Sequence, residues 1–213
     1  IRLIPVALGA SFLRVILAYS LSFSVALPLA LLLYRKPKVA RVGLPAVEIV
    51  ASVPATALFP ILVFVLVPSV GLEATSILML MTGMIWYLFF NLLSGLRAIP
   101  PDLDEAARSF GLRRDGYYRR LVFPAVLPAL VTGSITAFGG GWNALIVAEY
   151  FSSGTRVFMV PGIGELLNLG NNETGGAPLL LATLLTLIFT VVAINELLWK
   201  PLYRRVTDRY RYE

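Results

Sequence analysis

Long stretches without any charged residue are the feature that most constrains how this chain can fold. Five such intervals occur, of 20, 24, 23, 28 and 22 residues, at positions 15–34, 49–72, 74–96, 121–148 and 174–195. A helix needs about 20 apolar residues to cross a hydrocarbon core about 30 Å thick. Five helices buried in the core of a soluble protein would be shorter and would each carry a polar face. The pattern therefore predicts an all-α membrane protein, a polytopic transmembrane helix bundle of about five spans.

The composition excludes several classes of function. Hydrophobic residues make up 58% of the chain and charged residues 14%, against roughly 25% charged in an average soluble domain. There are no cysteines and no histidines, which rules out disulfides, thiolate or imidazole metal ligands, and Ser-His or Cys-His catalysis. The net charge of +6 comes from short basic clusters between apolar runs, which favours contact with lipid over nucleic acid.

The positions of the lysines and arginines predict the orientation. Segments 35–48, 97–120 and 200–213 hold 4, 6 and 5 of them, 15 of the 18 in total. With five spans these segments share one side, and the positive-inside rule makes that side cytoplasmic, so the C-terminus is cytoplasmic. We treat residues 1–213 as one domain. Its expected parts are spans at about 8–34, 46–68, 74–96, 123–148 and 178–199, a cytoplasmic loop at 97–122 and an outer loop at 149–177.

The cytoplasmic loop contains the pattern of a short, capped helix. Two prolines, at 100 and 101, should end the third span. Asp102 can then cap a new helix, with Glu105 three residues later completing a pair that resembles a capping box. Gly111 stands where a left-handed C-terminal cap is expected. A helix of about two turns is marginal in water by itself and must be held by packing. Its apolar face, at i, i+3, i+4 and i+7, is formed by Leu103, Ala106, Ala107 and Phe110.

The same loop resembles the EAA signature, E-A-A-x3-G-x9-I-x-L-P, of bacterial ATP-binding-cassette (ABC) import permeases. Glu105, Ala106 and Ala107 are followed after three residues by Gly111 and after nine more by the segment 121–124, Leu-Val-Phe-Pro. Two positions depart conservatively, because Leu121 replaces the usual Ile and Phe123 the usual Leu. Within the family the chain is most similar to the nitrate, sulfonate, taurine and bicarbonate branch, including its tandemly fused members.

The resemblance implies a function and a set of partners. It implies the type I ABC importer permease fold in a bacterial inner membrane, with the helix at 102–111 seated on a separate ATPase subunit. The implied partners are two ABC ATPase subunits, a second permease domain, a periplasmic or lipid-anchored solute-binding protein, and membrane lipids. The second domain is a copy, a paralogue or a fused half. This chain is expected to bind no cofactor, with ATP and Mg²⁺ on the ATPase subunits, and no metal.

Polar residues on the fourth and fifth spans are candidates for a translocation path. These candidates are Thr132, Thr136, Asn143 and Thr186. The alternative for each is that small and hydroxyl residues let helices pack closely in lipid. Ion-coupled carriers place ionisable residues at membrane depth, and no predicted span has one near its centre. A driving force outside this chain is therefore favoured. The resemblance to the nitrate, sulfonate, taurine and bicarbonate branch implies that the solute is a small anion such as nitrate, bicarbonate or an organic sulfonate.

Two other classes of function stay open at this point. The first is a passive channel or membrane scaffold without ATPase coupling, in which the basic loops bind anionic lipid. The second is an intramembrane enzyme, which the lack of histidine and cysteine disfavours. The chain begins at Ile1 in a mostly apolar stretch without the order of a signal peptide, so we expect it to be part of a longer chain.

Overall fold

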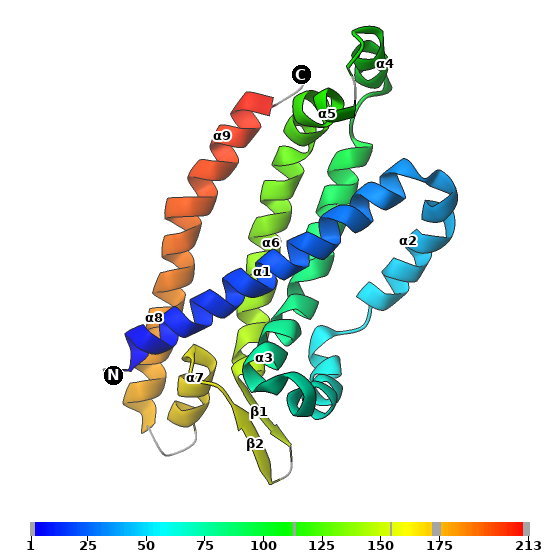
Figure 1. Ribbon diagram of the computed structural model, residues 1–213. Helices are drawn as coiled ribbons and strands as arrows, with labels where there is room; N and C mark the ends of the chain where they lie inside the picture. Colours follow the sequence, from blue (N-terminus) through cyan, green and yellow to red (C-terminus); the bar gives the residue numbers. More distant parts are fainter. Residues whose placement is uncertain (1–2, 113, 154, 172–175, 211–213) are drawn as a thin grey trace.

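The computed structural model describes residues 3–112, 114–153, 155–171 and 176–210, and these form a helical bundle with one small hairpin (Figure 1). The fold is the all-α membrane type that the charge-free intervals predict. The elements in chain order are α1 Ile4–Arg35, α2 Pro37–Ala51, α3 Ala55–Arg97, α4 Pro101–Ser109, α5 Arg114–Tyr117, π-helix η1 Tyr118–Val122, α6 Phe123–Glu149, β1 Tyr150–Ser153, β2 Arg156–Met159, α7 Ile163–Asn171, α8 Gly176–Ile194, π-helix η2 Asn195–Trp199 and α9 Lys200–Tyr210.

Four helical stretches in the described part of the chain are long and apolar enough to cross a membrane. They are Ile4–Arg35, Ala55–Arg97, Tyr118–Glu149 and Gly176–Arg209. The segment predicted as the second span, 46–68, is not a helix of its own. It covers the end of α2 and the beginning of α3, with a break at residues 52–54.

Two local features explain why this second segment is broken. Pro54 disfavours a helical conformation at the residue before it, and it stands at the N-terminal boundary of α3 with ψ 124°. Further along, Gly71 has φ +79° and ψ 172°, a conformation that side-chain-bearing residues rarely adopt, and α3 bends sharply there. Residues 55–70 therefore run at one end of the bundle before the rest of α3 crosses it (Figure 1).

The core lies where α3 packs against α1 and α6. Met79, Leu80, Leu88 and Phe89 of α3 are almost fully buried there. Glycine lets the α3 and α6 backbones come unusually close, because a Cβ at Gly140 would overlap the Gly83 carbonyl oxygen. Small residues play this role in membrane helix pairs, whose association depends on van der Waals packing.

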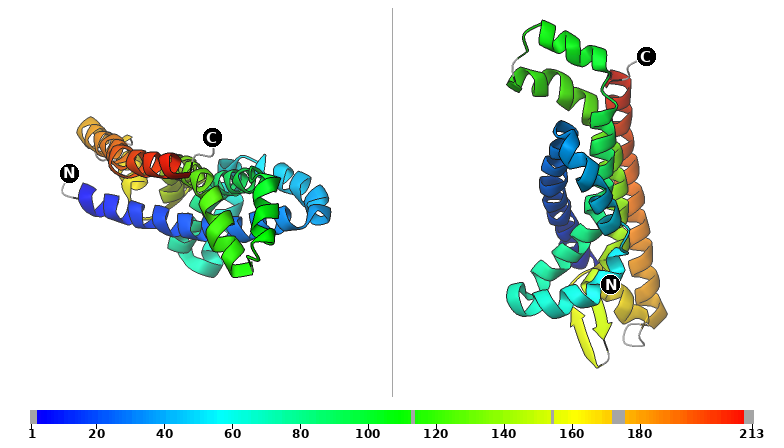
Figure 2. Two further views of the ribbon diagram at one scale, coloured as in Figure 1. Left: turned by 90° about the horizontal axis from the view of Figure 1, so that it is seen from above. Right: turned by 90° about the vertical axis from the view of Figure 1, so that its right-hand side faces the viewer.

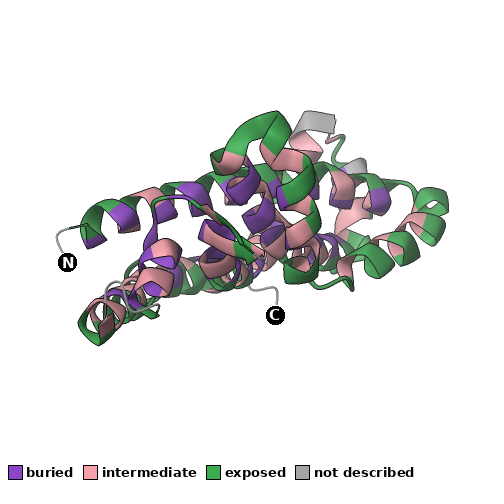
Figure 3. Ribbon diagram, turned by 90° about the horizontal axis from the view of Figure 1, so that it is seen from below, coloured by how far each residue is buried: buried purple, intermediate pink, exposed green. Residues whose placement is uncertain are grey.

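The molecule has two distinct ends, which agree with the predicted charge asymmetry. Helices α4 and α5 and the end of α9 lie at one end, and the β1–β2 hairpin, α7 and the start of α1 lie at the other (Figures 1 and 2). Coloured by burial, the helices show buried residues facing the interior and exposed residues along their outer sides (Figure 3). On α8 the only buried residue is Thr183, so most of that helix is available to lipid or to another protein.

Candidate coupling site and translocation path

Helix α4 stands out from one end of the bundle, next to α5 (Figure 2). It begins at Pro101, whose fixed φ and missing N–H suit the first position of a helix. Asp102 was expected at the N-cap, but this start places it and Asp104 in the first turn. Acidic side chains in a first turn are stabilised by the partial positive charge of the helix N-terminus. The beginning of α4 is therefore well specified without a capping side chain.

The other end of α4 closes with a left-handed glycine. Gly111 has φ +66°, as a left-handed C-terminal cap requires. The backbone N–H of Leu112 donates to the carbonyl of Ala107 at 3.0 Å, and that of Phe110 to the carbonyl of Ala106 at 2.9 Å. The first bond spans six residues and is the hallmark of a Schellman motif. The chain direction after α4 thus depends on Gly111.

The four residues of the predicted apolar face differ in exposure; three lie in α4 and Phe110 directly follows it. Ala107 is only 5% exposed, while Phe110 is 84% exposed. Leu103 and Ala106 are intermediate, and Glu105 is exposed. The sequence predicted one continuous apolar face, whereas Ala107 is already covered by this chain. Phe110, at the tip of α4, offers the largest apolar surface to another protein.

A tyrosine connects α4 to the rest of the bundle. Burial raises the pKa of Tyr117, and hydrogen bonds with Asp104 of α4 and Tyr34 of α1 raise it further. The phenol therefore stays protonated and bridges two elements that are distant in sequence. The π-helix η1 follows directly, and π-helical turns often occur at functional sites. These groups therefore connect α4 to α1 and, through η1, to the start of α6.

The structure brings three of the four predicted path residues together on one face. Thr132, Thr136 and Asn143 are exposed along α6. The hydroxyls of Thr132 and Thr136 each donate to the carbonyl four residues earlier, at 3.1 Å. Thr186 does not join them: it is half-buried on α8, donates to the carbonyl of Ala182 at 2.7 Å, and belongs to a helix that packs on α7.

Sequence reasoning missed the part of this polar face that α3 contributes. A Cβ at Gly133 would meet the side chain of Asn91, and one at Gly140 would meet the ring of Tyr87, so both α3 side chains lie beside α6. Tyr87 and Asn91 also line a recess of about 380 Å³, together with Ser52 and residues near the start of α3. A polar face without charge therefore extends over α6 and α3.

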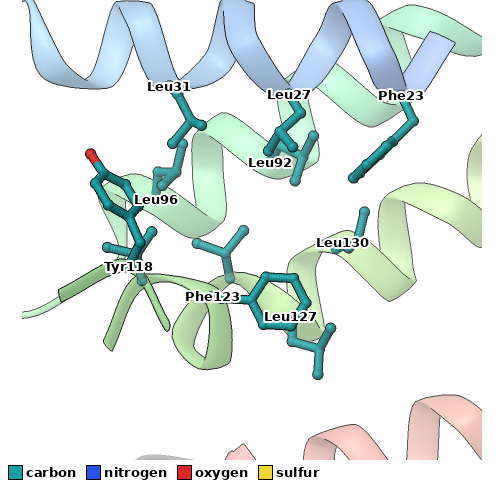
Figure 4. Close-up of a pocket in the computed structure, with 11 residues that line it drawn as sticks. Phe23, Leu27, Leu31, Leu92, Leu96, Tyr118, Phe123, Leu127 and Leu130 are labelled. Atoms are coloured by element: carbon teal, nitrogen blue, oxygen red, sulfur yellow. The ribbon is translucent and has the colours of Figure 1, made fainter. Parts of the chain in front are cut away.

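A second, smaller pocket is lined almost entirely by apolar side chains. It holds about 200 Å³ between α1, α3 and the η1–α6 segment, and leucine and phenylalanine side chains point into it (Figure 4). Tyr118 supplies the only polar group among its lining residues. Such a pocket offers nothing to bind a hydrophilic solute, so the uncharged polar face is the better candidate for the path.

A buried charge network lies near the opposite end of the bundle, away from the centres of the predicted spans, where no ionisable residue was expected. Arg14 is 5% exposed and Glu149 is fully buried. The Arg14 Nη1 donates to Glu149 Oε1 at 2.7 Å and to the carbonyl of Pro161 at 2.9 Å. Its Nε and Nη2 bind both carboxylate oxygens of Glu73, at 2.7 and 2.6 Å. A single arginine thus joins α1, α6 and the segment just after the Gly71 bend.

The same network holds the start of α7. The Ser11 hydroxyl donates to Glu149 at 2.7 Å and accepts from the backbone N–H of Ile163 at 2.9 Å. The Gly164 N–H donates to Glu149 Oε2 at 2.8 Å. The first N–H groups of a helix have no acceptors within the helix. At the start of α7, Ser11 of α1 and Glu149 of α6 are the acceptors. Charge counting missed this, because Arg14 and Glu149 each lie at an end of a charge-free interval.

Together, a helical bundle with four membrane-length helices, a projecting capped helix and an uncharged polar face defines a multi-pass membrane transport component. In the described residues no group of three or more acidic side chains is arranged to hold a metal ion. Residues 7–198 match the family "binding-protein-dependent transport system inner membrane component". Because the match covers most of the chain, this protein belongs to that family.

Relatives of known type support the branch suggested by the sequence. The chain is 27% identical over 161 residues to the taurine transport system permease protein TauC of Escherichia coli, covering 75% of this chain and 58% of the relative. It is 26% identical over 166 residues to the nitrate import permease NrtB of Leptolyngbya laminosa, covering 78% and 58%. With the bicarbonate permease CmpB of Synechococcus elongatus it shares 33% identity over 92 residues, 43% of this chain and 31% of the relative.

The fold has a close counterpart among solved structures. A chain of the MetNI methionine ABC transporter, in an inward-facing conformation, superposes with a TM-score of 0.76 at 21% identity, covering 96% of both chains. This likeness confirms the type I importer permease fold. The chain spans about 58% of the length of the taurine and nitrate permeases that it matches.

Proposed function

We propose that this chain is the membrane-spanning domain of an ATP-driven importer of a small anion, coupled to a separate ATPase subunit through α4. The single observation that supports coupling best is the form of α4: a helix projecting from the bundle, closed by Gly111 and presenting Phe110. A helix so short needs a partner surface to hold it. The proposed orientation places α4 and the C-terminus in the cytoplasm, where most of the lysines and arginines lie.

In this proposal ATP-driven closure of two ATPase subunits moves α4, and the bundle follows. Asp104 and Tyr34 both hydrogen-bond with Tyr117, which gives the motion a route from α4 into α1. The α3–α6 contact at Gly83 and Gly140 is tight, so these two helices move as a unit. Alternating access then arises from rotation of such units relative to a facing domain.

The location of the polar face supports a second permease domain. Thr132, Thr136 and Asn143 are exposed on a helix that is otherwise apolar. The hydroxyls of Thr132 and Thr136 already donate to backbone carbonyls, so the cost of facing lipid falls mainly on the Asn143 amide, on the order of 1 kcal/mol or more without a partner. Two such domains facing each other would place both polar faces around one central path, where water or solute meets them.

The class of solute follows from the relatives and from the chemistry of the face. The matched permeases are named for taurine, nitrate and bicarbonate, all small solutes that carry an anionic group. The hydroxyl and amide groups of the α3–α6 face bind an anion weakly, which suits a path more than a storage site. Selection among anions then rests with a solute-binding protein that delivers them at the outer end.

The coupling role is tested by replacing Gly111 in the complete transporter. Gly111 has open space around its Cα, so Gly111→Val introduces a strained positive φ and no direct clash. The variant should remain in the membrane and lose solute-stimulated ATP hydrolysis. Gly9→Val is the matched control, because Gly9 also has open space and lies in a helix without positive φ. Equal stimulation of both variants would contradict the proposal.

A further inference from the structure

We propose that a pocket between α1, α2 and α3, at the end of the bundle that carries α4, binds the headgroup of an anionic phospholipid. The pocket holds about 550 Å³. Arg41 of α2 and Arg97 at the end of α3 both line it, and Tyr34 of α1 adds a phenol. The remaining lining residues are apolar or proline: Leu33, Pro37, Ala40, Leu44 and Pro45.

The two arginines are available for an external anion. Within the described part of the chain, neither Arg41 nor Arg97 has an ion pair with a carboxylate, and both are exposed. Arg35, nearby on α1, lies over the Tyr118 ring at 5.0 Å and likewise has no acidic partner. Two guanidinium groups lining one pocket repel each other unless an anion lies between them. A phosphate matches the fork geometry of arginine.

The surroundings of the pocket indicate a lipid as the source of that phosphate. Helix α2 has no buried residue. Its apolar side chains Val42, Ile49 and Val50 are 74%, 70% and 56% exposed. These side chains lie on the outer side of α2, which is thus available to lipid. On the pocket side, Ala40, Leu44 and Pro45 supply apolar surface for the acyl chains of a lipid whose headgroup lies at Arg41 and Arg97.

The location also fits the distribution of anionic lipid. Basic pockets between membrane helices on the cytoplasmic side bind anionic headgroups, and anionic lipids are concentrated in that leaflet. The apolar pocket of Figure 4 lacks any charged lining residue, so it cannot distinguish one headgroup from another. The proposed function enters this inference only through the orientation, which decides that the headgroup belongs to the cytoplasmic leaflet.

The site is tested on the complete transporter in nanodiscs that contain phosphatidylglycerol or phosphatidylcholine in both leaflets. Native mass spectrometry should find phosphatidylglycerol retained by the permease and phosphatidylcholine lost. Double substitution Arg41→Gln and Arg97→Gln should weaken retention about thirtyfold, since each basic residue near the surface contributes about fivefold. The double substitution Arg119→Gln and Arg120→Gln, which removes two exposed charges at the same end but outside the pocket, should have at most a fivefold effect.

Two further measurements keep the test decisive. If the double variant fails to fold, retention by the unaltered transporter should fall steeply as salt is raised, because the contact is electrostatic. Inorganic phosphate at matched concentration should not displace the lipid, since it lacks acyl chains. Equal retention of both lipids, or equal loss in the pocket double variant and the Arg119/Arg120 double variant, would overturn the site, as would cross-linking that places a protein subunit in the pocket. Because binding is measured without transport, failure of ATPase coupling would leave this result unchanged.

Discussion

Replacing Glu149 by glutamine should destabilise the protein far more than the same change at Glu73. The Glu149 carboxylate is fully buried and accepts hydrogen bonds from Ser11, Arg14 and Gly164 at 2.7–2.9 Å. The amide nitrogen of glutamine is a donor, so at least one of these donors would face another donor. The substitution also leaves Arg14 buried with one fewer counter-charge.

The magnitude follows from the difference in burial between the two carboxylates. Removing one partner of a buried ion pair costs about 3–5 kcal/mol. The Glu73 side chain is 59% exposed, whereas that of Arg14, which it contacts at 2.6 Å, is 6% exposed. Because water screens the exposed carboxylate and Arg14 keeps Glu149, we take the range for surface pairs, about 0–1 kcal/mol, for Glu73. We therefore expect Glu149→Gln to lower the free energy of unfolding by about 3 kcal/mol or more, and Glu73→Gln by about 1 kcal/mol or less.

Chemical denaturation in detergent micelles, followed by tryptophan fluorescence, measures both values. Trp142 is buried in the core and reports the loss of packing. A double-mutant cycle with Arg14→Met and Glu149→Met sharpens the test. Each single variant leaves one buried charge of this pair without its partner, whereas the double variant removes both charges. The double variant should therefore be more stable than the summed effects of the two single variants predict. Equal effects of Glu149→Gln and Glu73→Gln, or additivity in the cycle, would refute the reasoning.

Three other predictions concern topology, packing and assembly. A cysteine at Ser153 should react with an impermeant thiol reagent in whole cells and one at Ser109 should not; the reverse pattern would contradict the orientation. Gly140→Val should reduce the amount of folded transporter several-fold in membranes, because its Cβ would overlap the Gly83 carbonyl, whereas an unchanged yield would show that α3 and α6 need no close contact. Cysteines at Asn143 in the two permease domains should cross-link to a species of twice the domain mass, or to an internal link in a fused chain; full activity with one domain alone would exclude this assembly.

The sequence predicted those parts of the fold that depend on local patterning. Apolar length identified four of the five predicted spans. The proline pair and the apolar spacing identified α4, and Gly111 its left-handed cap, although Asp102 lies in the first turn and not at the N-cap. Both signals act over a few turns of helix and need no knowledge of distant contacts. The division of basic residues likewise predicted which elements share an end of the bundle.

Features that depend on contacts between distant segments were not predictable in this way. The apolar run before Gly71 has the hydropathy of an ordinary span. Hydropathy does not report backbone direction, so the bend at Gly71 was not predicted. Arg14, Glu73 and Glu149 meet across 135 residues of sequence, and their pairing is visible only in three dimensions. Asn91 and Tyr87 join the polar face for the same reason, since the close approach of α6 brings them beside Gly133 and Gly140.

The most direct test of ATPase coupling is a cross-link from the tip of α4. The chain contains no cysteine, so Phe110→Cys introduces a single thiol at the most exposed apolar position of that helix. With the complete transporter carrying cysteines in the ATPase cleft, Phe110→Cys should form a disulfide to that subunit whose yield changes when ATP is added. Arg156→Cys, exposed on the hairpin at the opposite end, should form none. Absence of a cross-link at position 110 across the cleft, or equal cross-linking at 156, would contradict coupling through α4.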